Sequence, residues 1–337
     1  MRILIAGAFH DAWQEEAWAR ALRELGHEVS ELRLAPRPGS LSERVQNRLV
    51  TGPMIARLNR ALLEFAEERA PEVIVCYRAL LVTPATVAEL RKRARMVCYQ
   101  NDNVFGPLAG KAYWRLFKAA IPEYQLHLVY RDDDLARYQR SGARSVYLLR
   151  SHYLPWLHRP LPREALSGWE CDLGFFGHCE PDDRLEQLDA LMRAVPARYG
   201  LRGSSWQKYA RGRAWQGLET QEVSGEEYAR ALCGARIALG FLSTLNADRY
   251  TRRVFEIPAC GSLLLAPRTD VLRALYREDR EAVFYGSTAE LIERARHLLA
   301  HEGERAAIAG AGHARALQSG YDVHSRMREW LSALDKL

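Results

Sequence analysis

The feature that most constrains the fold of this chain is an end-to-end alternation of short apolar segments with amphipathic helical stretches. Residues 2–6 read Arg-Ile-Leu-Ile-Ala, residues 72–77 read Glu-Val-Ile-Val-Cys-Tyr, and similar runs recur to about residue 265. Each run suits one buried strand and is followed by a segment of helical periodicity. Strands that alternate with helices pair in parallel, so we expect α/β layers built on parallel sheets.

The same reading gives approximate positions for the individual elements. In the first half we expect strands at 2–6, 27–34, 72–77, 95–99, 127–130 and 145–148, a helix at 13–25 and a long helical region at 42–69. In the second half we expect strands at 171–177, 197–203, 214–217, 237–241 and 263–265, and helices at 183–195, 225–233, 290–300, 304–318 and 322–334. The chain of 337 residues is long enough for two domains.

Composition narrows the class of protein. Hydrophobic residues make up 48% of the chain, yet no apolar run reaches the roughly 20 residues of a membrane span. The first residues lack the apolar region of a signal peptide, so we expect a cytoplasmic protein. The net charge is +6, but only five of the 48 basic residues are lysines and no basic block appears, which argues against nucleic-acid binding. The positive balance suits an anionic ligand and leaves open a peripheral contact with anionic lipid or a lipid-linked acceptor.

The cysteines and acidic clusters do not predict a metal site. The six cysteines are scattered without a Cys-x-x-Cys pair, and we interpret them as buried free thiols. His178 and Cys179 adjoin, but no second ligand pair follows at zinc spacing. The run Arg131–Asp134 reads as the start of a helix, with Asp132 or Asp133 as its N-cap residue. No metal and no cofactor are therefore predicted.

The strongest candidate for a binding site lies between residues 248 and 267. Asp248 and Glu256 stand eight positions apart, with Arg252 and Arg253 between them, directly before a Gly-terminated helix and an apolar strand. A carboxylate at a helix start can accept hydrogen bonds from ribose hydroxyls, and neighbouring arginines suit a phosphate. The segment therefore predicts a nucleotide-diphosphate site, the alternative being ordinary surface ion pairs. Polar residues that precede the arginines are further candidates for the diphosphate, namely Tyr250 and Thr251.

The run 253–261 followed by Leu263-Leu-Leu resembles the C-terminal signature of the CgeB-like (spore-maturation-type) glycosyltransferases. These belong to the larger group-1 family, which has the GT-B fold. Members of that family carry Glu-x7-Glu, whose second Glu binds the ribose of the sugar nucleotide. Glu256 falls on the second position, while Asp248 stands at the first as a shorter acid. The resemblance extends from about residue 172 to the C-terminus and is weak over the first 150 residues.

The resemblance implies two Rossmann-like domains that face each other across a cleft. Residues 1–155 would form the acceptor domain, 156–318 the nucleotide-sugar domain, and 319–337 a helix that crosses back to the first domain. The proline-containing segment 152–162 matches the hinge of that fold. Gly177 matches the glycine of the family's phosphate-side loop, and with His178 it is a candidate donor contact.

Polar residues that follow two apolar strands are candidates for the acceptor side. His10 and Asp11 follow the first strand, and ligands bind at carboxyl ends in open parallel sheets. Either residue could act as a base or orient an acceptor hydroxyl, the alternative being that Asp11 caps the next helix. Four polar residues end another strand: Gln100, Asn101, Asp102 and Asn103. Asp102 could hold a sugar hydroxyl or deprotonate an acceptor, or the group could form an Asx turn.

Taken together, these patterns predict a glycosyltransferase of the hexosyltransferase type. It would move a sugar from a nucleotide-diphosphate donor to a hydroxyl of a glycan, protein or small-molecule acceptor, without a metal. The resemblance suggests retention of anomeric configuration, although related retaining enzymes carry a His near residue 102 and this chain does not. Two alternatives stay open, a non-catalytic sugar-nucleotide or glycan-binding protein and a nucleotide-sugar epimerase of the same fold.

Trp206 could stack on the base of the nucleotide, the alternative being that it fills the core.

Overall fold

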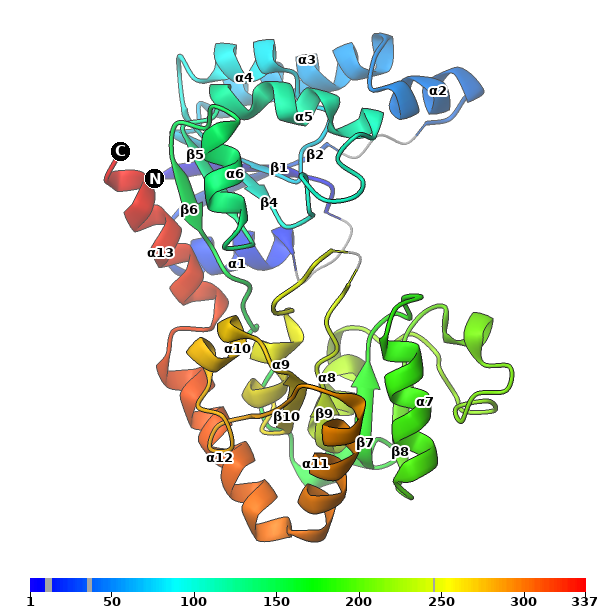
Figure 1. The fold of residues 1–337 in the computed structure, drawn as a ribbon. Coiled ribbons are helices and arrows are strands. Elements are labelled where there is room, and N and C mark those ends of the chain that lie inside the picture. Colours follow the sequence, from blue (N-terminus) through cyan, green and yellow to red (C-terminus); the bar gives the residue numbers. More distant parts are fainter. Residues whose placement is uncertain (10–13, 35–37, 245) are drawn as a thin grey trace. The chain divides into compact units, whose positions relative to one another are not determined.

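The computed structural model of the chain describes residues 1–9, 14–34, 38–244 and 246–337. The chain divides into two compact units (Figure 1). The first unit comprises Met1–Arg150 and Val323–Leu337, and the second comprises Ser151–Asp322. Sequence analysis put the two boundaries at 155/156 and 318/319, so each lies within five residues of the observed division.

The first unit contains a six-stranded parallel sheet in the order β2-β1-β3-β4-β5-β6. Its strands are β1 (Arg2–Gly7), β2 (Glu28–Arg33), β3 (Val73–Tyr77), β4 (Arg95–Gln100), β5 (Leu126–Val129) and β6 (Val146–Leu148). Strand β1 pairs with β2 on one side and with β3 on the other, so the strand order reverses between β1 and β3. A crevice at the carboxyl ends of these two strands is where such sheets bind ligands.

The helices of the first unit are α1 (Glu15–Glu24), α2 (Leu41–Leu49), α3 (Pro53–Arg69), α4 (Pro84–Leu90), α5 (Arg115–Ala120), α6 (Asp134–Arg140) and α13 (Val323–Asp335). The long helical region expected at 42–69 is confirmed, and the structure divides it into two helices. Val50 and Gly52 have φ values of 54° and 100°, which end α2. Pro53 then opens α3, a position where its missing N–H costs nothing. The short helix α4 was not predicted.

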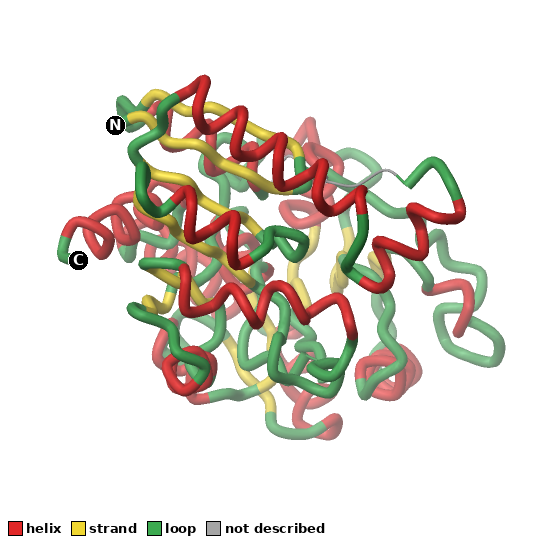
Figure 2. The backbone as a smooth tube through the Cα atoms, turned by 90° about the horizontal axis from the view of Figure 1, so that it is seen from above, coloured by secondary structure: helices red, strands yellow, loops and turns green. Residues whose placement is uncertain are grey.

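Side chains of the first sheet alternate between two helical layers. Cys76 belongs to a buried cluster that includes residues of α3, α4 and α5, and Figure 2 views the unit from the side on which these helices lie. The next residue, Tyr77, points to the opposite face, where its ring meets that of Trp18 of α1 at 5.1 Å. Trp18 also stacks on Trp330 of α13 at 6.3 Å. The last helix thus completes the second layer of the first unit.

The second unit contains a five-stranded parallel sheet in the order β11-β10-β9-β7-β8. The strands are β7 (Cys171–Phe176), β8 (Tyr199–Arg202), β9 (Ala235–Leu239), β10 (Leu263–Pro267) and β11 (Val283–Tyr285). The helices are α7 (Arg184–Ala194), α8 (Gly225–Gly234), α9 (Arg253–Ala259), α10 (Asp270–Leu275), α11 (Thr288–Ala300) and α12 (Glu302–Gln318). Here the strand order reverses between β7 and β9.

One expected strand is absent from the second unit. Residues 214–217 form a turn, where sequence analysis placed a strand. The apolar character of this segment comes from Trp215, which is fully buried and meets the ring of Trp206 edge-on at 5.6 Å. Trp206 is fully buried as well, which places it in the core and away from a stacking role on a bound base.

Other local expectations can be compared directly with the structure. Five of the six cysteines are buried, Cys233 is half-buried, and all six are free thiols. Asp133 is the N-cap residue of α6, but its side chain does not cap the helix. Asp132 instead binds Arg150 at 2.8 Å, so its expected capping role is wrong. No helix in the described parts of the chain is long and apolar enough to cross a bilayer.

Candidate functional site

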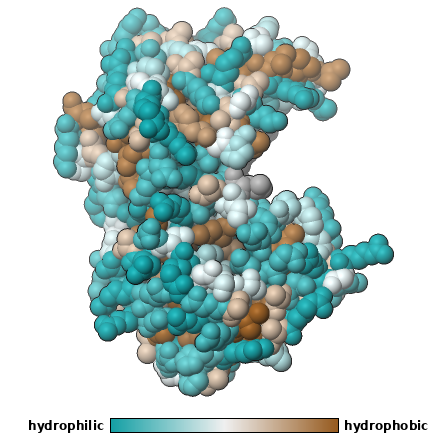
Figure 3. All heavy atoms as spheres, in the orientation of Figure 1, coloured by the Kyte–Doolittle hydropathy of each residue, from teal (hydrophilic) through white to brown (hydrophobic). Residues whose placement is uncertain are grey.

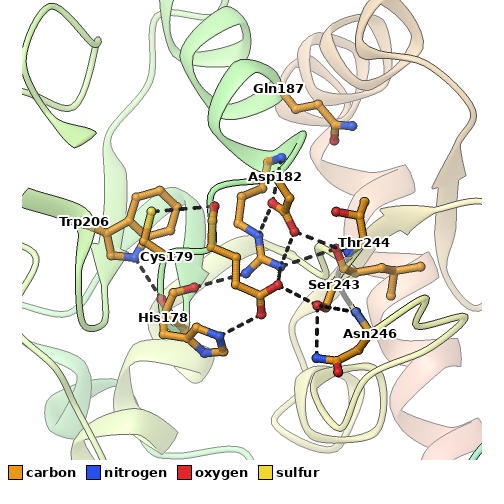
Figure 4. Close-up of polar contacts among 12 residues, drawn as sticks. His178, Cys179, Asp182, Gln187, Trp206, Ser243, Thr244 and Asn246 are labelled. Atoms are coloured by element: carbon orange, nitrogen blue, oxygen red, sulfur yellow. Dashed lines mark hydrogen bonds and ion pairs between the residues drawn. The ribbon is translucent and has the colours of Figure 1, made fainter. Parts of the chain in front are cut away.

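The order of the second sheet brings two loops together at its carboxyl edge. The chain leaves β7 toward β8 on one side and later returns as β9 on the other side of β7. The loops after β7 and β9 therefore meet where the strand order reverses. Ser243 of the second loop donates a hydrogen bond from Oγ to Glu180 Oε2 of the first loop at 2.5 Å. Figure 4 shows that side chains of both loops converge here.

Arg184, the first residue of α7, ties this edge together. Its Nε lies 2.7 Å from Asp182 Oδ1, and its Nη2 lies 3.2 Å from Glu180 Oε2. It also donates to the carbonyl of His178 at 3.1 Å (Figure 4). Burial acts to raise the pKa of Glu180, but hydrogen bonds from His178 and Ser243 and the charge of Arg184 outweigh it and lower the pKa to about 2. Arg184 is thus engaged on all sides and fixes the two loops.

Gly177, the residue after β7, lies where the backbone is crowded. Its N–H donates to the carbonyl of Arg202, and its carbonyl accepts from Trp206 Nε1 at 2.8 Å. A Cβ on Gly203, which has φ +144°, would lie 2.0 Å from that same carbonyl oxygen. Because the Gly177 N–H is already used, this residue contributes space to the site and not a free backbone donor.

Arg253 occupies the space that Gly177 leaves. A Cβ on Gly177 would lie 2.8 Å from Nη1 of Arg253, and the guanidinium lies over the ring of Phe175 at 5.0 Å. Burial lowers the pKa of Arg253, and the positive charge of Arg184 lowers it further. Among the described residues, Arg253 has no hydrogen bond or ion pair, and its Nε is buried without an acceptor. A half-buried cation with a buried, unused donor favours an anionic ligand.

A cavity of about 450 Å³ opens at this edge. It is lined from α7, from the loop after β9 and from the end of β10 by Asp183, Arg184, Gln187, Phe241, Leu242, Ser243, Thr244, Ala247, Asp248 and Pro267. Asp248, a predicted site residue, is therefore on its wall. The cavity is large enough for a small organic ligand.

Glu256 is more deeply buried than a carboxylate that binds a ribose needs to be. The residue is fully buried, and its Oε2 accepts a hydrogen bond from the Tyr228 hydroxyl at 2.7 Å. Arg252 Nε lies 2.5 Å from Oε1, and His158 Nε2 lies 3.7 Å from the same atom. A ribose can reach this carboxylate only if Tyr228 or Arg252 moves aside. Ribose binding by Glu256 stays a prediction.

His158 approaches Glu256 as a neutral imidazole. Its Nδ1 accepts a hydrogen bond from the N–H of Leu154 at 3.0 Å, so Nε2 carries the proton and faces the carboxylate. Burial lowers the pKa of His158 to about 4, and the negative charge of Glu256 offsets this only in part. Sequence analysis treated residues 152–162 as a connector and missed this contact.

Two neighbouring candidates differ in their surroundings. Tyr250 is 2% exposed and meets the ring of Phe255 at 5.8 Å, so its ring belongs to the core. Thr251 is half-buried, and its Oγ1 has no partner among the described residues. Thr251 directly precedes the two arginines, so its hydroxyl is the better candidate for an anion.

The carboxyl edge of the first sheet has a different character. A cavity of about 500 Å³ opens where the strand order reverses between β1 and β3, and it is lined by Gly7, Ala8, Leu34, Asn47, Arg48, Leu58, Tyr77, Arg78, Ala79, Leu80, Leu81, Val82 and Tyr113. Most of these side chains are apolar. A cavity of about 630 Å³ lies at the opposite edge of the same sheet, beside Arg2 and Glu72, where parallel sheets do not place their ligands.

Asp102 meets an arginine at this edge. Its Oδ2 lies 2.9 Å from Nη2 of Arg78, the residue that follows β3 and has φ 49°. The backbone N–H of Asp102 donates to Gln100 Oε1 at 2.9 Å, and Arg131 donates to the carbonyl of Asn101 at 2.6 Å. The Asp102 side chain is 41% exposed and can still receive a ligand hydroxyl. Asn103 is buried beside this group.

The remaining candidates lie outside the described part of the chain. His10 and Asp11 are not among the described residues, so their predicted roles are untested. The loop that precedes them is anchored by Glu15, whose carboxylate accepts from the N–H groups of Ala8 at 2.9 Å and Phe9 at 3.3 Å.

Several residues of these edges escaped sequence analysis. Arg78 follows an apolar strand, as Gln100 does, so the same argument could have found it. The i, i+4 pair Glu180–Arg184 was visible in the sequence. No sequence pattern pointed to Tyr228, because it lies on another helix than Glu256 and the two residues are 28 positions apart.

Comparison with solved structures identifies the architecture. Sucrose-phosphate synthase of Thermosynechococcus elongatus superposes with a TM-score of 0.74 at 12% identity, over 100% of this chain and 99% of that chain. HepE of Anabaena, solved with UDP and glucose, gives a TM-score of 0.71 at 15% identity, over all of both chains. A putative UDP-N-acetylglucosamine 2-epimerase of Listeria monocytogenes gives 0.64 at 11% identity, over 99% and 95% of the chains.

This chain has the GT-B fold. The two parallel α/β sheets expected from the sequence are thereby confirmed. Residues 184–332 match the model of a family described as glycosyl transferase-like. No curated protein matches the sequence. The CgeB-like subtype stays a prediction.

Proposed function

We propose that this GT-B protein is a glycosyltransferase whose second unit binds a nucleotide-diphosphate sugar. The observation that carries the proposal is Arg253, a half-buried guanidinium without a hydrogen-bond acceptor beside Gly177. It lies at the point of the sheet where ligands are expected, in the region that matches the glycosyl transferase-like family. A diphosphate supplies both the charge and the acceptor oxygens that this guanidinium lacks.

The chemistry follows from the charge of the leaving group. Breaking the bond between the sugar and the diphosphate leaves negative charge on the phosphate oxygens. A guanidinium that is already held in place stabilises that charge without reorganisation. Arg253 is positioned by the Phe175 ring and by the space above Gly177, while the network around Arg184 fixes the loop beneath it. This arrangement supplies cationic stabilisation from the protein itself, in keeping with the metal-independent transfer predicted from the sequence.

The first unit would present the acceptor. Asp102 is a partly exposed carboxylate at its carboxyl edge, and Arg78 holds it in one orientation. A carboxylate so placed can accept the proton of an attacking hydroxyl or orient it. The apolar cavity beside Arg78 would receive the less polar part of the acceptor. Retention of anomeric configuration, predicted from the family resemblance, remains part of this proposal.

A peripheral membrane contact is also part of the proposal. Leu41, Val45 and Leu49 recur every four residues on α2 and are 78%, 48% and 52% exposed. Apolar atoms gather on the surface over this helix in Figure 3. Arg44 and Arg48 belong to the same helix and suit anionic headgroups. A lipid-linked acceptor would be met at such a surface.

The epimerase alternative is supported by one of the compared structures, the putative 2-epimerase of Listeria monocytogenes. An epimerase and a transferase would both bind a nucleotide-diphosphate sugar, so binding alone does not separate them. Incubation with the donor alone does, because an epimerase converts the sugar without an acceptor. Release of free nucleotide only when an acceptor is added would favour the transferase.

The proposal is tested first by ligand-induced stabilisation. The full chain is melted with UDP, GDP, dTDP or CDP, each with and without EDTA, and UDP comes first because HepE was solved with it. A ligand that binds only the folded state raises the melting temperature. We expect one nucleotide to stabilise the wild type and the Arg249→Ala control, with or without EDTA, and not Arg253→Ala. Arg249 is exposed and pairs loosely with Asp270 at 3.7 Å. Stabilisation of Arg253→Ala to the wild-type extent would refute the proposed site.

A further inference from the structure

We propose that the corner between α11 and α12 is a binding site for a divalent transition-metal ion, with zinc as the best match. Three side chains meet there: His297, His301 and Glu304. One possible ligand atom from each lies within 4.8 Å of the others. Within the described part of the chain, they form the one set of three or more such residues that is this compact.

The local fold explains why the three side chains meet. His297 and His301 are four positions apart at the end of α11, so they lie on one face of the helix, and their rings stack at 4.1 Å. The chain turns at His301 and starts α12 at once, which returns Glu304 to the same place. His297 Nε2 lies 2.7 Å from Glu304 Oε2.

A hydrogen bond sets the tautomer of His301. Its Nδ1 lies 2.8 Å from the carbonyl oxygen of His297. A carbonyl only accepts, so Nδ1 carries the proton and Nε2 of the neutral ring has a free lone pair. A backbone carbonyl that holds the second nitrogen in this way is the usual support of a metal-bound histidine.

The chemistry of the set selects the ion. Two imidazoles and one carboxylate suit zinc and neighbouring transition metals, whereas magnesium and calcium prefer oxygen ligands alone. His297 and Glu304 are 46% and 49% exposed, so the ion has access and water can complete its coordination. On binding, the ion takes the place of the proton that His297 and Glu304 share in their hydrogen bond.

The place of this site in the fold separates it from Arg253. Helix α11 starts after the carboxyl end of β11 and runs back along the sheet, so its last turn lies at the amino edge. Arg253 and Gly177 lie at the carboxyl edge. The metal would therefore join the end of α11 to the start of α12 and stabilise the second unit, without a part in glycosyl transfer.

The test uses the untagged full chain after removal of metal with a chelator. We expect one equivalent of Zn²⁺ to raise the melting temperature, and one equivalent of Co²⁺ to give the visible absorption of a nitrogen- and oxygen-ligated ion. His301→Ala and Glu304→Gln should abolish both signals while they melt like the wild type in chelator. Glu302→Gln removes a carboxylate two residues away, outside the set, and should keep both signals.

Two results would overturn the proposal. One is the lack of either signal in the wild type. The other is an equal signal in the wild type, His301→Ala and Glu304→Gln, which would show an adventitious ion only. If a variant melts early even in chelator, the Co²⁺ spectrum of folded protein at low temperature decides, because it reports the ligands and not the stability.

Discussion

The two units place their cavities at the same topological position but line them with different chemistry. In each sheet the strand order reverses beside the first strand of the unit, and a cavity opens at the carboxyl edge there. In the first unit the lining is mostly apolar, with Arg78 paired to Asp102 at its rim. In the second unit a buried ion network fixes the loops and leaves Arg253 without an acceptor.

This difference shows how one architecture provides two kinds of site. The backbone topology decides where a ligand can bind, because it decides which loops diverge at the sheet edge. The side chains after each strand decide what binds. Arg78 already has a carboxylate partner in Asp102. Arg253 has no acceptor among the described residues, so a bound anion would have to supply one. This difference is the basis of our proposal that the anionic donor binds the second unit and the acceptor the first.

The largest effect that would sharpen this assignment is expected at Asp102. Asp102→Asn should lower kcat by about a hundredfold or more, because a positioned base contributes on that scale, with little change in UDP affinity. Turnover and UDP binding are measured on the same preparation. Asp132→Asn is the matched control, since it removes another exposed carboxylate bound to an arginine of the first unit. Equal losses in both variants would show that the effect is structural.

The second effect concerns the pH dependence of stability. His158 titrates near 6.5 when unfolded but at about 4 in the folded protein. Between these values the unfolded chain binds the extra proton, so the free energy of unfolding falls as the pH drops from 6.5 to 4. The loss approaches about 3 kcal/mol for this shift of roughly 2.5 pH units. Denaturant unfolding at several pH values measures it, and His158→Gln should show a shallower decline.

A matched histidine exists in the first unit. Burial also lowers the pKa of His127 to about 4, and its Nε2 lies 2.8 Å from the carbonyl oxygen of Ile121. His127→Gln should flatten the same window of the profile. If His158→Gln keeps the wild-type slope while His127→Gln does not, then His158 is protonated beside Glu256 in the folded state and our description of that contact is wrong.

The third effect concerns UDP binding and compares the two arginines, Arg253 and Arg78, directly. Arg253→Ala should weaken UDP binding by about thirtyfold, on the order of 2 kcal/mol for lost charge-assisted hydrogen bonds, whereas Arg78→Ala should leave it unchanged. Isothermal titration calorimetry gives both values. If Arg78→Ala proves the more damaging of the two for UDP, then the donor belongs to the first unit.

The smallest effect is expected at α2. Replacing Leu41 and Val45 together by Glu should reduce binding to phosphatidylglycerol vesicles several-fold, because apolar burial and headgroup attraction are both weakened. Flotation with labelled vesicles measures the bound fraction. Leu317→Glu, at an apolar residue of the second unit that is 52% exposed, serves as the control. Equal binding by wild type and the double variant would remove the membrane contact from the proposal.

The sequence predicted most of the strands because most are short apolar runs, but it gave no strand at β11. It failed at 214–217, where Trp215 made a turn look like a strand while it filled the core beside Trp206. It did not place the break between α2 and α3 inside the helical region 42–69, because helical periodicity continues across residues 50–53 although the backbone leaves the helical conformation there.

The site was predictable to the level of segments but not of contacts. Gly177 and Arg253 were both chosen from the sequence, and the structure places them against each other. Which of the two adjacent arginines keeps its donors unused could not be inferred, because Arg252 and Arg253 precede Glu256 by four and three residues, and both spacings allow an ion pair on a helix. The network of Glu180, Arg184 and Ser243 depends on β7 and β9 being neighbours, which is a property of strand order.

The return of α13 to the first unit affects how the protein is made. The second unit is one continuous segment and can fold as soon as residue 322 has left the ribosome. Most of the first unit is synthesised before the second unit, but the partner of Trp18, Trp330, is synthesised after it. Until then an aromatic surface of α1 is open to water and to other nascent chains. Helix α1 is thus covered only after the whole second unit has been made, and exposed apolar surface of this kind favours aggregation of an incompletely folded chain.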